Sequence, residues 1–194
     1  MSLIAPLALV ACGEGEASIP TVPVTAADFS FSLPETIAGG LIRLQLTNSG
    51  QDSHHLQVVK LNQGVSQQQF QDTLQETLQA FPQEGEAALG RIFQIIAFAG
   101  GPSGIGPGGQ SEAVVDLQAG DYVLLCFIAG ADGIPHLAKG MVQPLTVTAP
   151  PSDRPTEPVA LATVGLEDFA FTGVPATLSE GTTTLKVTNQ GQEP

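Results

Sequence analysis

The stretch CFIAGADGIPHLAKGM, residues 126–141, brings one cysteine, one histidine and one methionine into a single short segment. The whole chain of 194 residues has only 2 Cys, 3 His and 2 Met. The other two histidines, His54 and His55, stand together in TNSGQDSHHLQVV, residues 47–59. Thiolate, imidazole and thioether groups are soft or borderline ligands of transition metals. Their concentration in two segments therefore indicates a metal site to which both segments contribute.

The composition favours a turn-rich β protein over a helical bundle. Hydrophobic residues make up 42% of the chain and charged residues 13%, with 22 Gly and 15 Pro. Gly and Pro punctuate strands and interrupt helices. The net charge of −13 and the pI of about 4.2 argue against nucleic-acid binding, because a polyanion repels phosphate backbones.

Short apolar or alternating runs between turn signals predict strands. One helix is predicted where Ser66 and Gln69 form a capping-box pattern and Phe70, Leu74 and Leu78 follow on one face. Residues 89–99 fit either a strand or a helix, and 100–109 fit a loop. The predicted strands are residues 22–31, 41–47, 55–61, 112–117, 121–128 and 141–147.

The N-terminus has the features of an export signal. Its apolar run, residues 3–11, is too short to span a bilayer and ends in Leu9-Val10-Ala11-Cys12, which resembles the lipobox of bacterial lipoproteins. No Lys or Arg precedes the run, and a buried strand or helical turn is the alternative. We expect a signal over 1–11, lipidation of Cys12, and a tether over 12–20. The protein would then be exported, to the periplasmic or extracellular face, and held to a bacterial membrane only by its lipid.

A second copy of the first part of the chain follows a proline-rich stretch. Residues 28–53 return as residues 168–194 with a one-residue insertion, so that Asp28 matches Asp168 and Asn48 matches Asn189. Residues 150–158 between the copies read as a semi-rigid linker. Because a few strands cannot bury a β core, residues 159–194 are interpreted as an incomplete second module of a longer tandem protein.

The first module, residues 21–149, resembles the cupredoxins, the family of plastocyanin- and azurin-like blue copper proteins. LQLTNSGQDSHHLQVV is similar to the strand and turn that lead into the first histidine ligand, and GDYVLLC to the strand that enters the cysteine. His136 and Met141 are separated by four residues, with Gly140 before the methionine, as in plastocyanin-type loops. One feature departs from the family: nine residues separate Cys126 from His136, more than is usual. The resemblance implies an all-β, Greek-key β-sandwich with one inserted helix, followed by the start of a second similar module.

Two imidazoles and a thiolate with a weak axial thioether are the ligand set of type 1 copper. We therefore expect one copper per complete domain, held by His54, Cys126, His136 and, axially, Met141. Zinc is the weaker alternative because it has no use for Met141. His54 is chosen over His55 because it shares a strand face with Leu56 and Val58, which leaves His55 on the surface or at the rim of the site.

The predicted function is one-electron transfer with a redox partner protein, and not enzymatic catalysis. The alternative is a metal-free or copper-storing cell-surface module built of tandem repeats. In the metal-free case, Cys126 and Met141 are ordinary core residues and His54 is a hydrogen-bonded histidine at the end of a strand.

Overall fold

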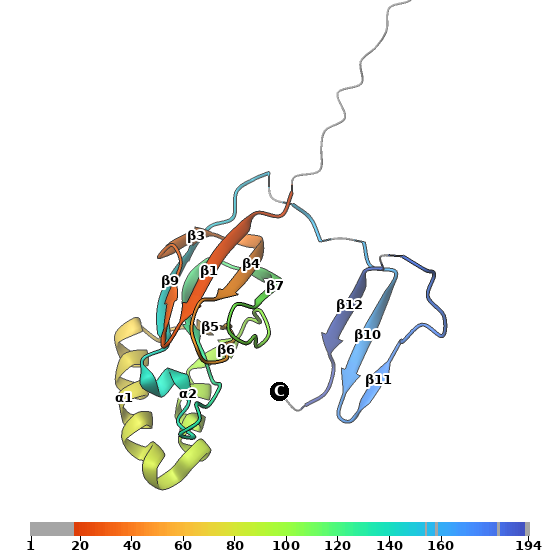
Figure 1. Ribbon diagram of the computed structural model, residues 1–194. Helices are drawn as coiled ribbons and strands as arrows, with labels where there is room; N and C mark the ends of the chain where they lie inside the picture. The colour runs from red at the N-terminus through yellow and green to blue at the C-terminus, as the bar shows by residue number, and fades with distance from the viewer. Residues whose placement is uncertain (1–17, 154, 158, 182, 193–194) are drawn as a thin grey trace, which may run out of the picture. The chain divides into compact units, whose positions relative to one another are not determined.

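The alternating apolar residues of the first part of the chain form two β-sheets (Figure 1). The computed structural model describes residues 18–192 except 154, 158 and 182. The predicted signal, Cys12 and most of the predicted tether lie outside the described residues. The chain divides into two compact units, Met1–Pro155 and Thr156–Pro194, and each is considered by itself.

The two sheets of the first unit form a sandwich. One sheet has the order β2-β1-β4-β7, and the other has the order β3-β9-β8-β5-β6. β1 pairs parallel with β4, and β3 pairs parallel with β9, while the other pairs are antiparallel. The strands are β1 Thr21–Ala27, β2 Ser30–Ser32, β3 Thr36–Ala38, β4 Gly40–Asn48, β5 Gln57–Leu61, β6 Ile96–Phe98, β7 Gln110–Leu117, β8 Gly120–Leu125 and β9 Val142–Thr148.

The main core lies between the two sheets, and it ends at the predicted ligands. Leu44 and Leu46 of β4 pack in one cluster with Val58 of β5 and Leu124 of β8. Cys126 and Met141 belong to the same cluster and are fully buried. Burial of this apolar surface is the main term that stabilises such a sandwich. The predicted β-sandwich with one inserted helical segment is confirmed for this unit.

The helical insert covers the outer face of the second sheet. Phe70 and Leu74 of α1 (Gln67–Glu84) pack with Val123 and Leu125 of β8 in a second core. Ser66 caps α1 with the predicted capping box, and its partner is Gln69. A 3-10 turn, Gly85–Leu89, leads into the short helix α2, Gly90–Phe93. Within the described part of the chain, no helix is long and apolar enough to cross a membrane.

Two predicted elements differ from the structure. The strand predicted over residues 22–31 is two strands, β1 and β2, because the chain turns at Asp28 and Phe29. The Asp28 carboxylate accepts the backbone N–H groups of Gln51 and Asp52, which fixes this turn beside the β4–β5 loop. The ambiguous segment 89–99 contains both alternatives, since it holds α2 and then strand β6.

The second unit repeats the strand pairing of the first. Its three strands, β10 Ala162–Glu167, β11 Ala170–Thr172 and β12 Leu185–Asn189, form one sheet in the order β11-β10-β12. Ala162 pairs with Leu185, as the equivalent Val22 pairs with Leu44. Gly165 likewise pairs with Thr172, as Thr25 pairs with Ser32. The sequence repeat is therefore also a repeat of strand register.

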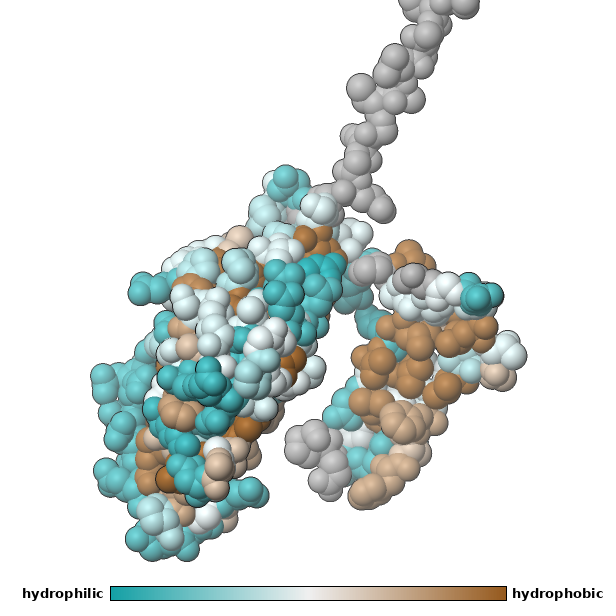
Figure 2. Space-filling model, viewed as in Figure 1, coloured by the Kyte–Doolittle hydropathy of each residue, from teal (hydrophilic) through white to brown (hydrophobic). Residues whose placement is uncertain are grey.

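The second unit leaves exposed the apolar side chains that the first unit buries. Leu185 and Val187 are 37% and 57% exposed, whereas their counterparts Leu44 and Leu46 are 0% exposed. Figure 2 shows hydrophobic residues gathered on the side of this unit that faces the viewer. In the first unit, the equivalent residues are covered by the second sheet. Three strands alone provide no such cover.

Candidate metal centre

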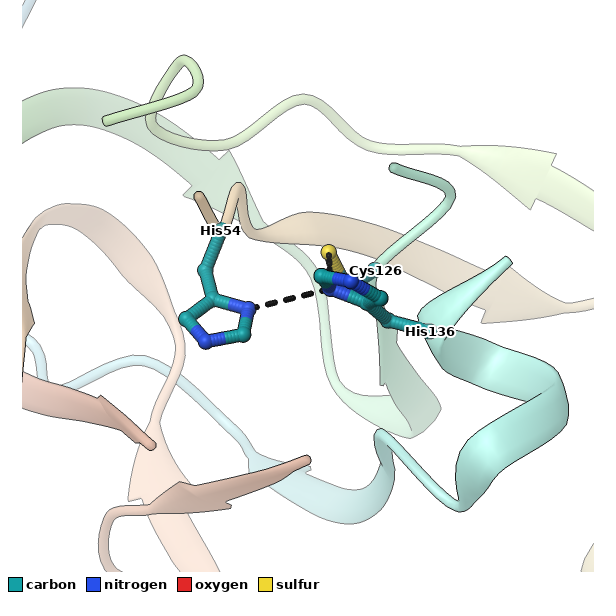
Figure 3. A group of neighbouring side chains, drawn as sticks. All are labelled: His54, Cys126 and His136. Atoms are coloured by element: carbon teal, nitrogen blue, oxygen red, sulfur yellow. Dashed lines mark hydrogen bonds between the residues drawn. The ribbon is translucent and has the colours of Figure 1, made fainter. Parts of the chain in front are cut away.

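Three of the predicted ligands converge at one end of the sandwich (Figure 3). One ligand atom from each of His54, Cys126 and His136 lies within 4.8 Å of the others, and all three side chains are buried. The two Nδ1 atoms are 3.1 Å apart, and the Cys126 Sγ lies 3.6 Å from the Nδ1 of His136. Two nitrogen ligands of a single metal ion have a separation of this size, since each bond is about 2 Å long.

Backbone hydrogen bonds hold the three positions in register. His54 pairs with Ile105 in an isolated bridge, with N–H···O distances of 3.0 and 2.8 Å. The Leu137 N–H donates to the Cys126 carbonyl at 2.8 Å, directly after His136. His136 begins the 3-10 turn His136–Lys139, which faces the end of β8. The three side chains therefore project from backbone that is held by hydrogen bonds.

The long segment between Cys126 and His136 is a small closed loop. Ala129 and Pro135 form an isolated bridge, and the Gly130 N–H donates to the Ile134 carbonyl at 3.0 Å. The His136 N–H then donates to the Ile128 carbonyl at 2.8 Å. The extra residues fold back on themselves, and His136 returns to the cysteine.

Met141 lies at the end of this loop and is fully buried. Its N–H donates to the His136 carbonyl at 3.0 Å, and its carbonyl accepts the Cys126 N–H at 3.3 Å. Its backbone is thus tied to two of the three converging residues, while its side chain belongs to the core cluster that contains Cys126. The role of its thioether as an axial ligand stays a prediction.

The Asp28 carboxylate orients the His54 imidazole through its Nε2, the ring nitrogen that does not face the site. The Asp28 Oδ1 lies 2.8 Å from the Nε2 of His54. The backbone N–H groups of Gln51 and Asp52, followed by His54, hold the pKa of the Asp28 carboxyl below its usual range. A carboxylate at Nε2 favours the tautomer whose proton is on Nε2, which leaves the Nδ1 lone pair facing the site. Sequence reasoning missed Asp28, although its repetition as Asp168 was visible.

The side chain of Asn48 fixes the turn between the end of β4 and His54. The buried Asn48 side chain donates to the carbonyls of Asp52 and Ile105, at 2.8 and 3.0 Å, and accepts the Gly50 N–H at 2.8 Å. One side chain therefore joins the end of β4 to the segment that pairs with His54. The rigidity of this turn sets the direction of the imidazole.

His136 is enclosed and incompletely satisfied. Its Nε2 is buried without a hydrogen-bond partner among the described residues, and the nearest carboxylate oxygen in an ion-pair geometry, Asp52 Oδ2, is 3.7 Å away. The Phe29 ring centre lies 4.8 Å from its own. Burial first, and then the nearby charge of His54, lowers the pKa of His136. A neutral imidazole with its Nδ1 directed at a thiol and a second imidazole is suited to bind a metal.

The cysteine sulfur lies against His55 as well as His136. Burial raises the pKa of the Cys126 thiol, and the backbone N–H groups of His55 and Ile128 partly offset this effect. The Nδ1 of His55 is 3.4 Å from Sγ, and its ring centre is 6.1 Å from that of Phe127. Burial, followed by the charge of His136, lowers the pKa of His55. His55 is half-buried, so the prediction of a rim position describes it better than that of a surface residue.

The donor set fits copper better than the ions that prefer oxygen. Two Nδ1 atoms and one thiol sulfur converge, and the methionine that is tied to them is buried. The carboxylates of Asp28 and Asp52 lie on the far side of the imidazoles, at the Nε2 atoms of His54 and His136, and among the described residues no carboxylate belongs to the converging group. Thiolate and imidazole ligands suit both common oxidation states of copper.

Comparison with known proteins gives structural matches only. No protein-family model matches the chain, and no curated protein sequence matches it significantly. Among solved structures, reduced auracyanin from Roseiflexus castenholzii shares 17% sequence identity with a TM-score of 0.43. The match covers 68% of this chain and 99% of the auracyanin chain. Auracyanin A from Chloroflexus aurantiacus, a "blue" copper protein, shares 15% sequence identity with a TM-score of 0.40. The match covers 68% of this chain and 100% of auracyanin A. The azurin Az-iso2 from Methylomonas sp. strain J shares 17% sequence identity with a TM-score of 0.38. The match covers 68% of this chain and 99% of the azurin.

Proposed function

We propose that this chain is an exported copper protein that carries one electron at a time. The observation that carries the proposal is the convergence of His54 Nδ1, His136 Nδ1 and Cys126 Sγ in a buried cluster. His54, Cys126 and His136 would hold the ion, with Met141 as the axial ligand. Copper supplies a one-electron couple in such a site.

The residues around the cluster would do three things for an electron carrier. Asp28 and Asn48 keep His54 in one orientation. The backbone N–H groups of His55 and Ile128 stabilise negative charge on the Cys126 sulfur. The surrounding core excludes water. A site held rigid in this way changes little between oxidation states, which keeps the reorganisation that accompanies electron transfer small.

Export and lipid anchoring at Cys12 belong to this proposal, and they rest on the N-terminal sequence pattern alone. In an oxidising compartment, a thiol with no disulfide partner in the described chain needs another role, and metal ligation would supply one. The test is fractionation of expressing bacteria: the wild type is expected in the membrane fraction, and Cys12→Ser in the soluble fraction or retained with its signal.

The copper site is tested by adding Cu(II) to the purified protein and recording the visible spectrum and the bound metal. We expect a strong thiolate-to-copper charge-transfer band that disappears in Cys126→Ala and shifts in Met141→Leu. Cys12→Ala is the matched control, because it removes the chain's other cysteine and is expected to keep the band. Wild-type protein that retains no copper and shows no band would refute the proposal.

A further inference from the structure

Three phenylalanines form an aromatic cluster at the end of the second sheet. Phe93 of α2, Phe98 of β6 and Phe127 after β8, here called the phenylalanine patch, have ring centres 5.7 to 6.4 Å apart. Phe93 and Phe98 are 44% and 52% exposed, and Phe127 is half-buried. Aromatic rings with this exposure are typical of contact surfaces.

The patch is joined to the metal centre in two ways. Phe127 is the covalent neighbour of Cys126. In addition, the His55 ring contacts both the sulfur and the patch. Its Nδ1 is 3.4 Å from the Cys126 Sγ, and its ring centre is 6.1 Å from that of Phe127. A chain of bonded atoms and close contacts therefore leads from the sulfur to exposed aromatic edges.

The histidine side of the centre is covered by other residues. Both His54 and His136 are 0% exposed. Phe29 packs on His136, and the Lys139 ammonium lies 4.7 Å from the centre of the Phe29 ring. Asp132 fixes Lys139 from the loop at 2.9 Å. The inserted loop between Cys126 and His136 thus contributes to the group of residues that covers His136.

We propose that the phenylalanine patch is the docking surface for the protein that exchanges electrons with the Cys126 site. This inference rests on the copper function proposed above. In each encounter a reduced partner loses one electron and the copper site gains one, with no bond formed or broken and no proton transferred. The path would run from the aromatic edges through Phe127 and His55 to the sulfur.

The charges of the helical segment and of the whole chain define the kind of partner. The segment that carries Phe93, residues 67–93, contains Asp72, Glu76, Glu84 and Glu86 against the single cation Arg91. Glu84 already pairs with Arg91, at 2.6 and 2.8 Å. Since the whole chain carries a net charge of −13, electrostatic attraction favours a basic partner. The partner is therefore an electron-transfer protein with an apolar centre and a basic rim on its docking face.

The test uses the copper-loaded protein and a basic haem protein of the cytochrome c class as the reductant, with rates measured by stopped-flow absorbance. We expect Phe93→Ser and Phe98→Ser each to lower the second-order rate constant about tenfold, because aromatic residues at the centre of a contact dominate its strength. The rate should also fall as salt is added. Val114→Ser is the matched control, since Val114 is 42% exposed on β7 of the other sheet.

A further variant tests the opposite side of the site. Ile134 is 42% exposed and lies on the loop before His136. If Ile134→Ser slows the reaction and the phenylalanine variants do not, docking occurs over His136 and the inference is overturned. Equal rates in all variants overturn it too. Each variant is first checked for its copper band and for complete bleaching by dithionite, so that a folding defect is recognised. Absence of the band in wild-type protein refutes the copper function itself, whereas an intact band with unchanged rates refutes only the docking surface.

Discussion

Gly50 is a residue at which one methyl group should disturb the metal centre from the Nε2 side of His54, opposite the Nδ1 that faces the site. A Cβ built at Gly50 would overlap the Asp28 Oδ1 and lie 2.8 Å from the His54 Nε2, so it would separate these two groups. We expect Gly50→Ala to weaken copper binding about tenfold or more, which is the usual effect of losing an outer partner of a metal-bound histidine. Competition with a copper chelator measures the change in affinity.

The second unit offers the control for this prediction. Gly191 is the repeat equivalent of Gly50, and a Cβ there would overlap the Asp168 Oδ1 in the same way. Gly191→Ala therefore introduces the same local strain far from any predicted ligand in the sequence, and copper affinity should stay unchanged. If Gly50→Ala and Gly191→Ala both leave copper affinity unchanged, Asp28 does not position His54.

At the scale of single residues, the sequence could identify residues that converge in the structure but not the groups that support them. The alternation of His54, Leu56 and Val58 predicted which histidine faces inward, and all three are at most 1% exposed. Asp28 could not be assigned, because its contact with His54 spans 26 residues and depends on how the turn at Gln51 folds. His55 was expected on the surface or at the rim of the site, and its half-buried ring lies against the sulfur, a contact that the strand alternation does not predict.

At the scale of elements, the loop between Cys126 and Met141 depends on glycines with left-handed backbone. Gly140 has φ 102° and ends the 3-10 turn that carries His136, while Gly133 has φ 75° at the tip of the inserted loop. We expect Gly140→Ala to destabilise the protein by about 1–2 kcal/mol, because only glycine adopts such a φ without strain. It should also shift the copper band, since the Met141 N–H bonds the His136 carbonyl directly after Gly140.

Gly133→Ala is the comparison for this loop. It carries the same kind of backbone strain, and no atom would crowd a Cβ at either position. It should therefore lower the free energy of unfolding while leaving the copper band in place. Chemical denaturation and visible spectra of both variants separate the two effects. An unchanged band in Gly140→Ala would show that the loop end does not set the geometry of the ligands.

Strands and the helix were predictable where their patterns were local. The capping box at Ser66 and the apolar face of α1 appear in the structure as predicted. Strand β3 was missed because it has only three residues and pairs with β9, more than one hundred residues later. The predicted strand over 22–31 ignored the Asp28 turn, whose hydrogen-bond donors lie in another loop. Long-range partners, and not propensity, decide such cases.

At the scale of the whole molecule, the two units show that the same pattern of strand register can exist with and without a covering sheet. β10 and β12 pair in the same register as β1 and β4. The turn is reproduced as well, since the Gln192 N–H bonds Asp168 as the Gln51 N–H bonds Asp28. The register is therefore set by the strands and turn themselves, and the second sheet is not needed to define it.

This comparison predicts very different local stabilities. Among the described residues of the second unit, Val164 is the only buried residue of the hydrophobic core, while Phe171 is 73% exposed against 7% for its counterpart Phe31. Backbone hydrogen bonds without apolar cover open easily. In hydrogen–deuterium exchange, amides of β10 and β12 should therefore exchange at least about tenfold faster than those of β1 and β4. Because the paired strands share register and turn, the difference would measure what the second sheet contributes. Equal protection would mean that the exposed face of β10 and β12 is covered in solution by another surface.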